Sequence, residues 1–349
     1  MAALRKGAAF LLAVGLLGLG GAPSPDGRPD TAFLDGKHRG VCYAHAVGFL
    51  KDGGYGSPAS EKSLEALRAL GVKWISVTPF GFQREANAST FRWGGTDETD
   101  ARLRAVTAQA HALGMRVMMK PHLWLRPPSW PGSIEPRSEE GWAEWFETYE
   151  RFAVHYAGVA ADSHVDALCI GNELSKTTAH EKEWRGIIAS VRRAYAGPLT
   201  YGAEMEEVFS VPFWDALDFI GVSGYYPLVE ARSPDRSSLV AAWGPILARL
   251  SQLANRWRRK IVFTEAGYRS ADFAAWKHWQ VPGNATVNLR LQADAYEAFF
   301  QAVWPQPWFG GAYFWKWFSY PGHSGPDSNE WEIENKPAEA VLSRHYHDH

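Results

Sequence analysis

Short apolar runs alternate with longer stretches of helical periodicity along the chain after its first 30 residues. The runs lack hydrophobic–polar alternation, which is typical of parallel strands covered by helices on their outer face. Eight runs are predicted as strands, at 40–43, 73–78, 115–121, 167–171, 199–203, 218–223, 261–264 and 311–317. Helices are predicted at 61–70, 96–113, 139–161, 181–196, 211–216, 238–257, 289–303 and 337–345, and a long loop rich in Trp and Pro after the third strand. Eight strands, each followed by a helix, predict an α/β fold with a single (β/α)8 TIM barrel.

The first residues follow a different pattern. Arg5 and Lys6 precede an apolar run at 8–19, and small residues at 20–22 lead into a Pro-, Ser- and Asp-rich stretch. A basic start, a short apolar run and small residues are typical of a secretory signal peptide. The run is shorter than the roughly 20 residues that span a membrane, and an uncleaved membrane anchor is the alternative. We predict a signal peptide and short linker at 1–30, a barrel domain at 31–349, and a secreted or periplasmic protein.

Composition narrows the functional classes. The 349 residues are 46% hydrophobic and 21% charged, with a formal net charge of -2, so a nucleic acid is not expected as partner. The chain contains 17 Trp. Barrel packing accounts for single indoles, but the whole set favours carbohydrate, because indole faces stack on the flat C–H faces of sugar rings. Cys42 and Cys169 fall in the first and fourth predicted strands, which are not neighbours, so two buried thiols are expected rather than a disulfide.

Two carboxylates end predicted strands, where barrel enzymes place their chemistry. Glu173 follows the fourth strand directly after Asn172, and Glu265 follows the seventh. A single Glu at such a position is more often part of an ion pair at the rim. Glycoside hydrolysis, however, requires two carboxyl groups, one neutral acid and one ionised. A separation of about 5–5.5 Å gives retention of configuration, and mutual repulsion at that distance raises one of the two pKa values.

Other polar residues fall near strand ends. His45 follows the first strand, and a lone His is more often structural. Glu204, Glu206 and Glu207 follow the fifth strand and are predicted to line a subsite or form rim salt bridges. The histidines near the end are interpreted as a frayed tail rather than a metal site; they are His345, His347 and His349. We find no EF-hand loop or zinc motif and expect no cofactor, no metal and a monomer.

Six motifs carry a resemblance to a known family. They are Lys120-Pro121-His122, Gly171-Asn172-Glu173-Leu174, Tyr225-Tyr226-Pro227-Leu228, Thr264-Glu265-Ala266-Gly267-Tyr268, Phe314-Trp315-Lys316-Trp317 and Asn335-Lys336-Pro337-Ala338. In this order and spacing the chain resembles glycoside hydrolase clan A and, within it, family 113, whose characterised members are mainly endo-β-1,4-mannanases. The motifs lie between residues 120 and 338 of the chain.

The resemblance implies roles for individual residues. Glu173 would be the acid/base and Glu265 the nucleophile, with Asn172 bonded to the sugar 2-hydroxyl. Tyr225 would donate to Glu265, and Tyr226 would do so if the strand boundary is off by one.

The resemblance also implies substrate contacts. His122 and Trp124 would line the subsites, and Trp315 would be the platform under the sugar at the cleavage point. Trp317 is either a second such ring or part of the barrel wall. Lys316 would touch a hydroxyl group or pair with an acid.

The resemblance predicts a retaining endo-β-1,4-mannanase that acts on a polysaccharide or oligosaccharide by double displacement. Two alternatives stay open. One is a clan A hydrolase of another β-glycan, such as a glucan or chitosan. The other is a non-catalytic barrel that binds glycan.

Overall fold

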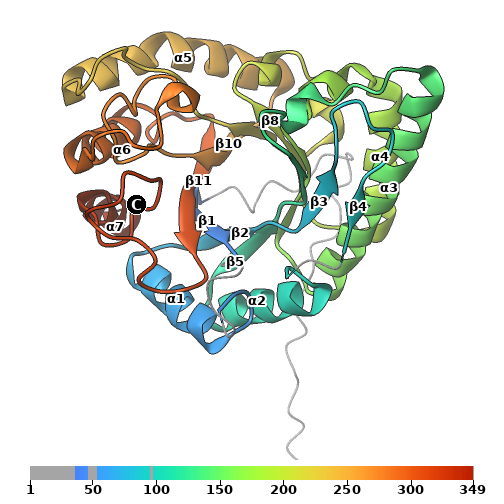
Figure 1. The fold of residues 1–349 in the computed structure, drawn as a ribbon, viewed down its shortest axis with the longest axis horizontal. Coiled ribbons are helices and arrows are strands. Elements are labelled where there is room, and N and C mark those ends of the chain that lie inside the picture. Colours follow the sequence, from blue (N-terminus) through green and yellow to red (C-terminus); the bar gives the residue numbers. More distant parts are fainter. Residues whose placement is uncertain (1–35, 46–52, 95–96, 349) are drawn as a thin grey trace, which may run out of the picture.

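The computed structural model describes residues 36–45, 53–94 and 97–348 of the chain, so the predicted signal peptide lies outside the described residues. Eight parallel strands close into a barrel in the order β1-β11-β10-β9-β8-β7-β5-β2 (Figure 1). They are β1 (His38–Ala44), β2 (Trp74–Val77), β5 (Arg116–Met119), β7 (Ala167–Asn172), β8 (Leu199–Glu204), β9 (Ile220–Ser223), β10 (Ile261–Ala266) and β11 (Phe309–Phe318). Each predicted strand overlaps one of them, and the predicted barrel is confirmed.

The described residues form seven α-helices, which surround the barrel (Figure 1). They are α1 (Pro58–Ala69), α2 (Asp100–Ala112), α3 (Glu139–Asp162), α4 (Glu181–Ala194), α5 (Arg236–Trp257), α6 (Leu289–Ala302) and α7 (Pro337–Asp348). The helix predicted at 211–216 is wrong, because only short 3-10 turns join β8 to β9 there. Pro212 lacks a backbone N–H, and Trp214 is buried and donates to the carbonyl oxygen of Val208 at 3.1 Å.

Side-chain caps fix the true starts of the first two helices. α1 begins at Pro58 rather than at 61, because the Ser57 hydroxyl accepts the N–H of Ser60 and Pro suits the first helical turn. α2 begins at Asp100 rather than at 96, because Thr99 caps it in the same way. No helix within the described ranges is long and apolar enough to cross a membrane.

The core has two parts. The larger part lies between the barrel wall and the helices. A smaller cluster from alternate strand positions fills the barrel interior; it contains Cys42, Trp74, Met118, Ala167, Cys169, Phe219, Val262 and Tyr313. Both cysteines are buried and free, so the prediction of two buried thiols is confirmed.

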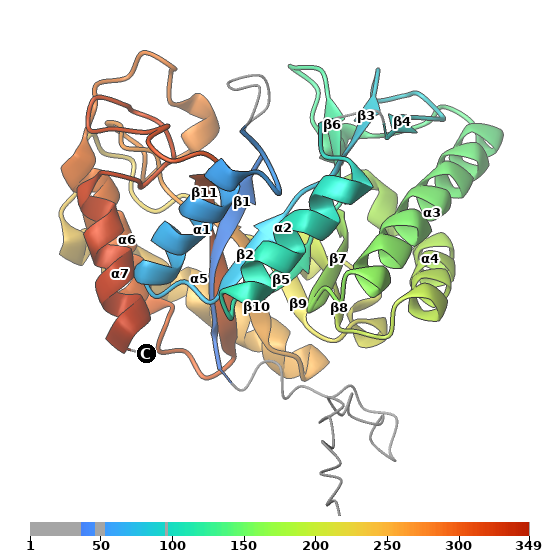
Figure 2. The same ribbon diagram turned by 90° about the horizontal axis from the view of Figure 1, so that it is seen from below.

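A second, three-stranded sheet rises from one side of the barrel mouth. Its strands, in the order β4-β3-β6, are β3 (Phe80–Gln83), β4 (Arg92–Trp93) and β6 (His122–Leu125). β3 follows closely on β2, and β6 on β5, so this sheet continues two barrel strands past the rim (Figure 2). The sequence did not predict it, and a loop was expected after the third barrel strand.

Candidate active site

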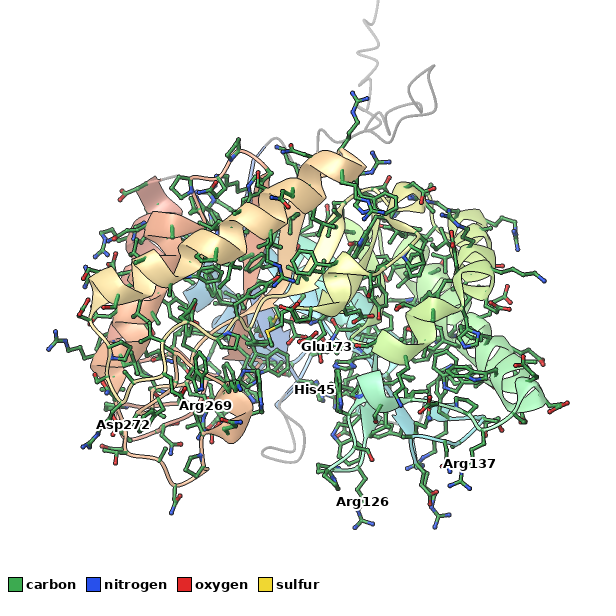
Figure 3. The ribbon with its side chains drawn as sticks, turned by 90° about the horizontal axis from the view of Figure 1, so that it is seen from above. His45, Arg126, Arg137, Glu173, Arg269 and Asp272 are labelled. Atoms are coloured by element: carbon green, nitrogen blue, oxygen red, sulfur yellow. The ribbon has the colours of Figure 1, made fainter. Side chains whose placement is uncertain are left out.

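The C-terminal ends of the barrel strands surround a cleft of about 730 Å³. It is lined by Pro128, Trp130, Glu173, Glu204, Met205, Ser223, Tyr225, Glu265, His278, Trp279, Trp315 and Trp331. The two carboxylates singled out from the sequence therefore share one cleft, and Glu173 lies near the centre of the molecule in the view of Figure 3. The structure brings Tyr225 and Trp315 into the same cleft, as the resemblance implied.

The backbone at Glu173 adopts a left-handed conformation, with φ of 54°. A non-glycine residue in this region costs on the order of 1 kcal/mol or more and is held there by its surroundings. Its N–H donates to the Gly202 carbonyl oxygen at 2.8 Å. The next N–H, of Leu174, donates to the Tyr201 hydroxyl at 2.7 Å, and that hydroxyl donates to Glu207 Oε1 at 2.6 Å. The bend that aims Glu173 into the cleft is thus supported from β8.

The three glutamates at the end of β8 and just after it have different surroundings. Glu207 is buried and braces the bend, and it also accepts from the Ser175 hydroxyl at 3.1 Å and from the N–H of Glu204 at 2.9 Å. Glu204 lines the cleft. Glu206 forms a two-bond ion pair with Arg249 on the exposed rim. The prediction of subsite lining or rim salt bridges fits Glu204 and Glu206. The buried position of Glu207, which supports the backbone bend through Tyr201, was not expected.

Both oxygens of Glu265 are held by donors. Lys120 Nζ, whose side chain is fully buried, donates to Oε1, and the Tyr225 hydroxyl donates to Oε2 at 2.8 Å. Tyr226 instead donates to the Met205 carbonyl oxygen at 3.2 Å. Tyr225 is therefore the tyrosine that contacts Glu265. Lys120 entered the sequence analysis only as part of a motif, so its contact with Glu265 was missed.

The two carboxyl groups have opposite pKa shifts. Burial and the nearby charge of Glu265 raise the pKa of Glu173 to about 8. Burial acts to raise the pKa of Glu265 as well, but the charge of Lys120 and the hydrogen bonds from Lys120 and Tyr225 outweigh it, so this pKa is lowered. At neutral pH Glu173 is mainly protonated and Glu265 is ionised, so the cleft holds one neutral carboxylic acid and one carboxylate, the pair that glycoside hydrolysis requires.

Asn172 stands between the two carboxylates and β6. Its Nδ2 lies 3.2 Å from His122 Nε2 and 3.5 Å from Glu265 Oε1. Burial lowers the pKa of His122 to about 4, so the ring is neutral at pH 7 and its Nε2 accepts from the amide. A Cβ at Gly202 would come within 2.4 Å of Asn172 Oδ1, so a glycine is required there. That Oδ1 is buried and has no hydrogen-bond partner among the described residues.

The aromatic residues of β11 point to different sides. Trp315 lines the cleft, with Lys120 Nζ 5.9 Å from the centre of its ring. Trp317 is buried in the wall and donates to the Ser63 hydroxyl at 2.9 Å, so it is a packing residue. Lys316 lies 3.8 Å from Glu332, which places it in an ion pair with an acid.

Trp124 was expected to line a subsite, and that role stays a prediction. Trp124 is 45% exposed on β6 and is not among the residues that line the cleft. Trp130, Trp279 and Trp331 do line it, and sequence reasoning missed them. The signal that could have found them is their position in the loops that follow barrel strands.

His45 and His345 have structural partners. His45 Nδ1 accepts from the Tyr55 N–H at 3.0 Å. His345 belongs to α7, stacks on Phe300 with ring centres 4.3 Å apart, and lies 3.2 Å from Glu297. The prediction of a frayed tail is therefore wrong for His345, because helix packing orders it.

The other two C-terminal histidines are placed differently. His347 also lies in α7, and its Nδ1 is 2.7 Å from the carbonyl oxygen of Ser343, one helical turn earlier. The frayed-tail prediction is therefore wrong for His347 as well. His349 lies outside the described residues.

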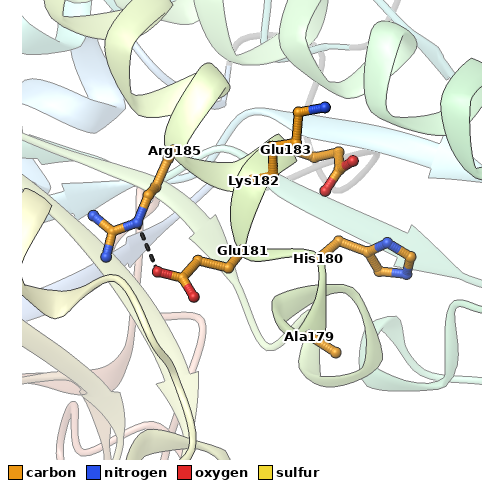
Figure 4. A pocket seen from close by; sticks show the side chains of 6 residues that line it. All are labelled: Ala179, His180, Glu181, Lys182, Glu183 and Arg185. Atoms are coloured by element: carbon orange, nitrogen blue, oxygen red, sulfur yellow. Dashed lines mark hydrogen bonds and ion pairs between the residues drawn. The ribbon is translucent and has the colours of Figure 1, made fainter.

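Another hollow, of about 640 Å³, lies at the start of α4 and is lined by Ala179, His180, Glu181, Lys182, Glu183 and Arg185 (Figure 4). Arg185 is paired with Glu181 at 2.7 Å and with Asp215 at 2.9 Å. The hollow shares no lining residue with the cleft. Across the described parts of the chain, no group of three or more His, Cys, Asp or Glu residues is placed to hold a metal ion.

A parallel (β/α)8 barrel whose mouth holds a protonated and an ionised carboxyl group among tryptophan rings defines a TIM-barrel glycoside hydrolase. The sequence profile of Glycoside Hydrolase Family 113 matches residues 46–336. The chain belongs to glycoside hydrolase family 113.

Solved structures agree with this assignment. The chain is 29% identical to the GH113 β-mannanase AaManA from Alicyclobacillus acidocaldarius, solved in complex with ManMIm, with a TM-score of 0.81 over 90% of this chain and 99% of that chain. A GH113 β-1,4-mannanase in a complex structure is 26% identical, with a TM-score of 0.80 and the same coverage of 90% and 99%. A β-glucuronidase from Ruminococcus gnavus, 14% identical with a TM-score of 0.58, shares the fold over 83% of this chain and 46% of its own. The comparison with curated proteins gave no match.

Proposed function

We propose that this glycoside hydrolase is a retaining endo-β-1,4-mannanase. The observation that carries the proposal is that Glu173 and Glu265 line one cleft, with Lys120 and Tyr225 both donating to Glu265. The opposite shifts of the two pKa values support an acid and an ionised carboxylate in this pair. The choice of retention rests on the resemblance to clan A, in which the Glu at the end of the seventh strand is the nucleophile. The choice of mannan is supported by the two β-mannanases that match this chain over nearly their full length.

The reaction proceeds in two displacements. Glu265 attacks the anomeric carbon while Glu173 gives its proton to the glycosidic oxygen, so the leaving sugar departs as an alcohol. Glu173, now ionised, then takes a proton from the water that attacks the same carbon, and Glu265 is released as a carboxylate. Tyr225 and Lys120 keep the nucleophile charged and aimed between turnovers.

Asn172 and Trp315 position the substrate. The Asn172 amide faces the sugar 2-hydroxyl, a contact that strengthens as charge develops at the anomeric carbon. The Trp315 ring lies under the sugar at the cleavage point. A polymeric substrate of this kind is met outside the cell, which agrees with the export predicted from residues 1–30.

The proposal is tested by product analysis on β-1,4-mannohexaose, with β-glucan and chitosan in parallel. We expect internal cleavage of mannohexaose, with the β-anomer as the first product detected by NMR. First formation of the α-anomer would overturn retention. Cleavage of glucan or chitosan alone would overturn the choice of mannan, and binding without cleavage of any polymer would overturn the enzymatic proposal.

Replacing Lys120 tests how Glu265 is kept ionised. In Lys120→Met the pKa of Glu265 rises, because burial is no longer opposed by a neighbouring cation. We expect kcat/KM on mannohexaose to fall by about 100-fold or more and the acid limb of the pH profile to move to higher pH. Lys316→Met is the matched control, since that ammonium pairs with Glu332, and its acid limb is expected to stay in place. An unmoved acid limb in Lys120→Met would show that Lys120 does not set the protonation of Glu265.

A further inference from the structure

One face of the small sheet β4-β3-β6 carries a row of aromatic rings. β3 and β6 pair in parallel, with Phe80 opposite His122 and Phe82 opposite Trp124. Because side chains alternate along a strand, these four rings share one face. Trp124 is 45% exposed, and the other three rings are partly buried.

The opposite face of this sheet is fixed against the core. Gln83, Leu123 and Leu125 are buried there, and Gln83 Oε1 accepts from the Trp145 indole N–H at 2.9 Å. A Cβ at Gly81 would come within 2.7 Å of the Leu123 side chain, so this face packs closely. The sheet is therefore a rigid support for the rings on its open face.

The four rings form a continuous strip, here defined as Phe80, Phe82, His122 and Trp124. Phe80 stacks on His122 with ring centres 5.7 Å apart, and Phe82 lies 6.4 Å from Phe80 and 5.9 Å from Trp124. The guanidinium of Arg92, on the paired strand β4, lies 5.8 Å from the Phe82 ring centre.

The inner end of the strip reaches the catalytic residues. His122 Nε2 lies 3.2 Å from Asn172 Nδ2. Phe80 also lines a smaller cavity of about 190 Å³, whose other residues include Trp315 and Lys316. Trp315 lines both this cavity and the catalytic cleft, so one path of rings leads from the cleavage point out to Trp124.

We infer that the strip binds the distal sugar rings of a long β-linked glycan whose cleavage point lies at Glu173 and Glu265. This inference rests on the proposed function and adds to it a binding track outside the cleft. The occupant follows from continuity with the catalytic residues and from chemistry. Pyranose rings present flat C–H faces to aromatic rings, and Arg92 adds donors for hydroxyl groups at the edge of the track.

The experiment compares a short and a long substrate. In the double variant Phe82→Ala/Trp124→Ala, the ratio of kcat/KM on β-1,4-mannohexaose to kcat/KM on β-1,4-mannotriose is expected to fall about tenfold or more, because the trisaccharide does not extend along the strip. A second measurement does not need turnover. Glu265→Gln protein is expected to be slowed in native gels that contain mannan, and the double variant in that background is expected to run faster.

Phe273→Ala is the control, because Phe273 is equally exposed, at 46%, in the loop after β10 and lines neither cavity. Thermal unfolding checks that each variant is folded. The inference would be overturned if the double variant kept both the wild-type ratio of kcat/KM on mannohexaose to kcat/KM on mannotriose and the same retardation in mannan gels. If wild-type protein cuts no β-glycan, the proposed function fails, and retardation in gels of mannan, glucan and chitosan still decides whether the strip binds glycan.

Discussion

Glu265→Ala is expected to lower kcat on mannohexaose by about 10⁵-fold, because removal of a covalent nucleophile leaves only binding and electrostatic effects. Added azide is expected to restore turnover of an aryl β-mannoside with a good leaving group. Azide attacks from the side that the carboxylate vacated, so the product is the α-mannosyl azide. The measurements are initial rates and NMR of the product.

Two controls accompany this experiment. Removing the carboxylate leaves Lys120 buried without its partner, a change that costs about 3–5 kcal/mol in comparable buried pairs. Glu265→Gln keeps the side-chain volume and separates loss of folding from loss of chemistry. Glu206→Ala removes an exposed carboxylate of the rim and is expected to stay within a few-fold of wild type. Activity of Glu265→Ala within tenfold of wild type would contradict the nucleophile role.

Glu173→Ala is expected to lower kcat/KM on mannohexaose by about 10³–10⁴-fold, because the leaving sugar then departs without a proton. An aryl mannoside with an acidic phenol needs no such proton, so its first step is expected to stay fast and its second step to become slow. Azide then accelerates the second step and yields the β-mannosyl azide, the opposite anomer to that from Glu265→Ala. Steady-state rates with and without azide measure this.

The pH profile of activity is expected to test the same assignment in a separate measurement. Glu173 must be protonated for the first step, so activity of the wild type falls as pH rises through about 8. Glu265 must be ionised, so activity falls as pH drops through its lowered pKa. In Glu173→Ala, tested on the aryl mannoside, the alkaline limb is expected to disappear. A persistent limb near pH 8 would show that another group is the acid.

The barrel and its catalytic pair were predictable from the sequence for a physical reason. Helices cover the outer face of a parallel barrel, so its strands are apolar throughout and a polar residue at a strand end stands out. Glu173 and Glu265 were found in this way. The small sheet was not found, because β3 and β6 each lie directly after a proline, a residue that usually marks a loop in the sequence.

Contacts between residues far apart in the sequence could not be predicted from it. Lys120 and Glu265 are 145 positions apart, and a lysine at a strand end looks the same whether it is solvated or buried. Glu207 was likewise grouped with Glu204 and Glu206, because only the fold shows that it turns inward to Tyr201. Lys120 and Glu207 were missed because their roles depend on a partner rather than on position along a strand.

The hydrogen bonds that support the backbone at Glu173 have a consequence for protein engineering. The acid/base follows β7, but the groups that hold its unusual backbone, Tyr201 and Glu207, come from β8 and the turn after it. A motif of Asn-Glu transplanted alone into another barrel would lack this support and relax to an ordinary conformation. The unit that can be transferred is therefore the pair of adjacent strands β7 and β8. A designed or recombined enzyme keeps the orientation of Glu173 only if both strands come from the same protein.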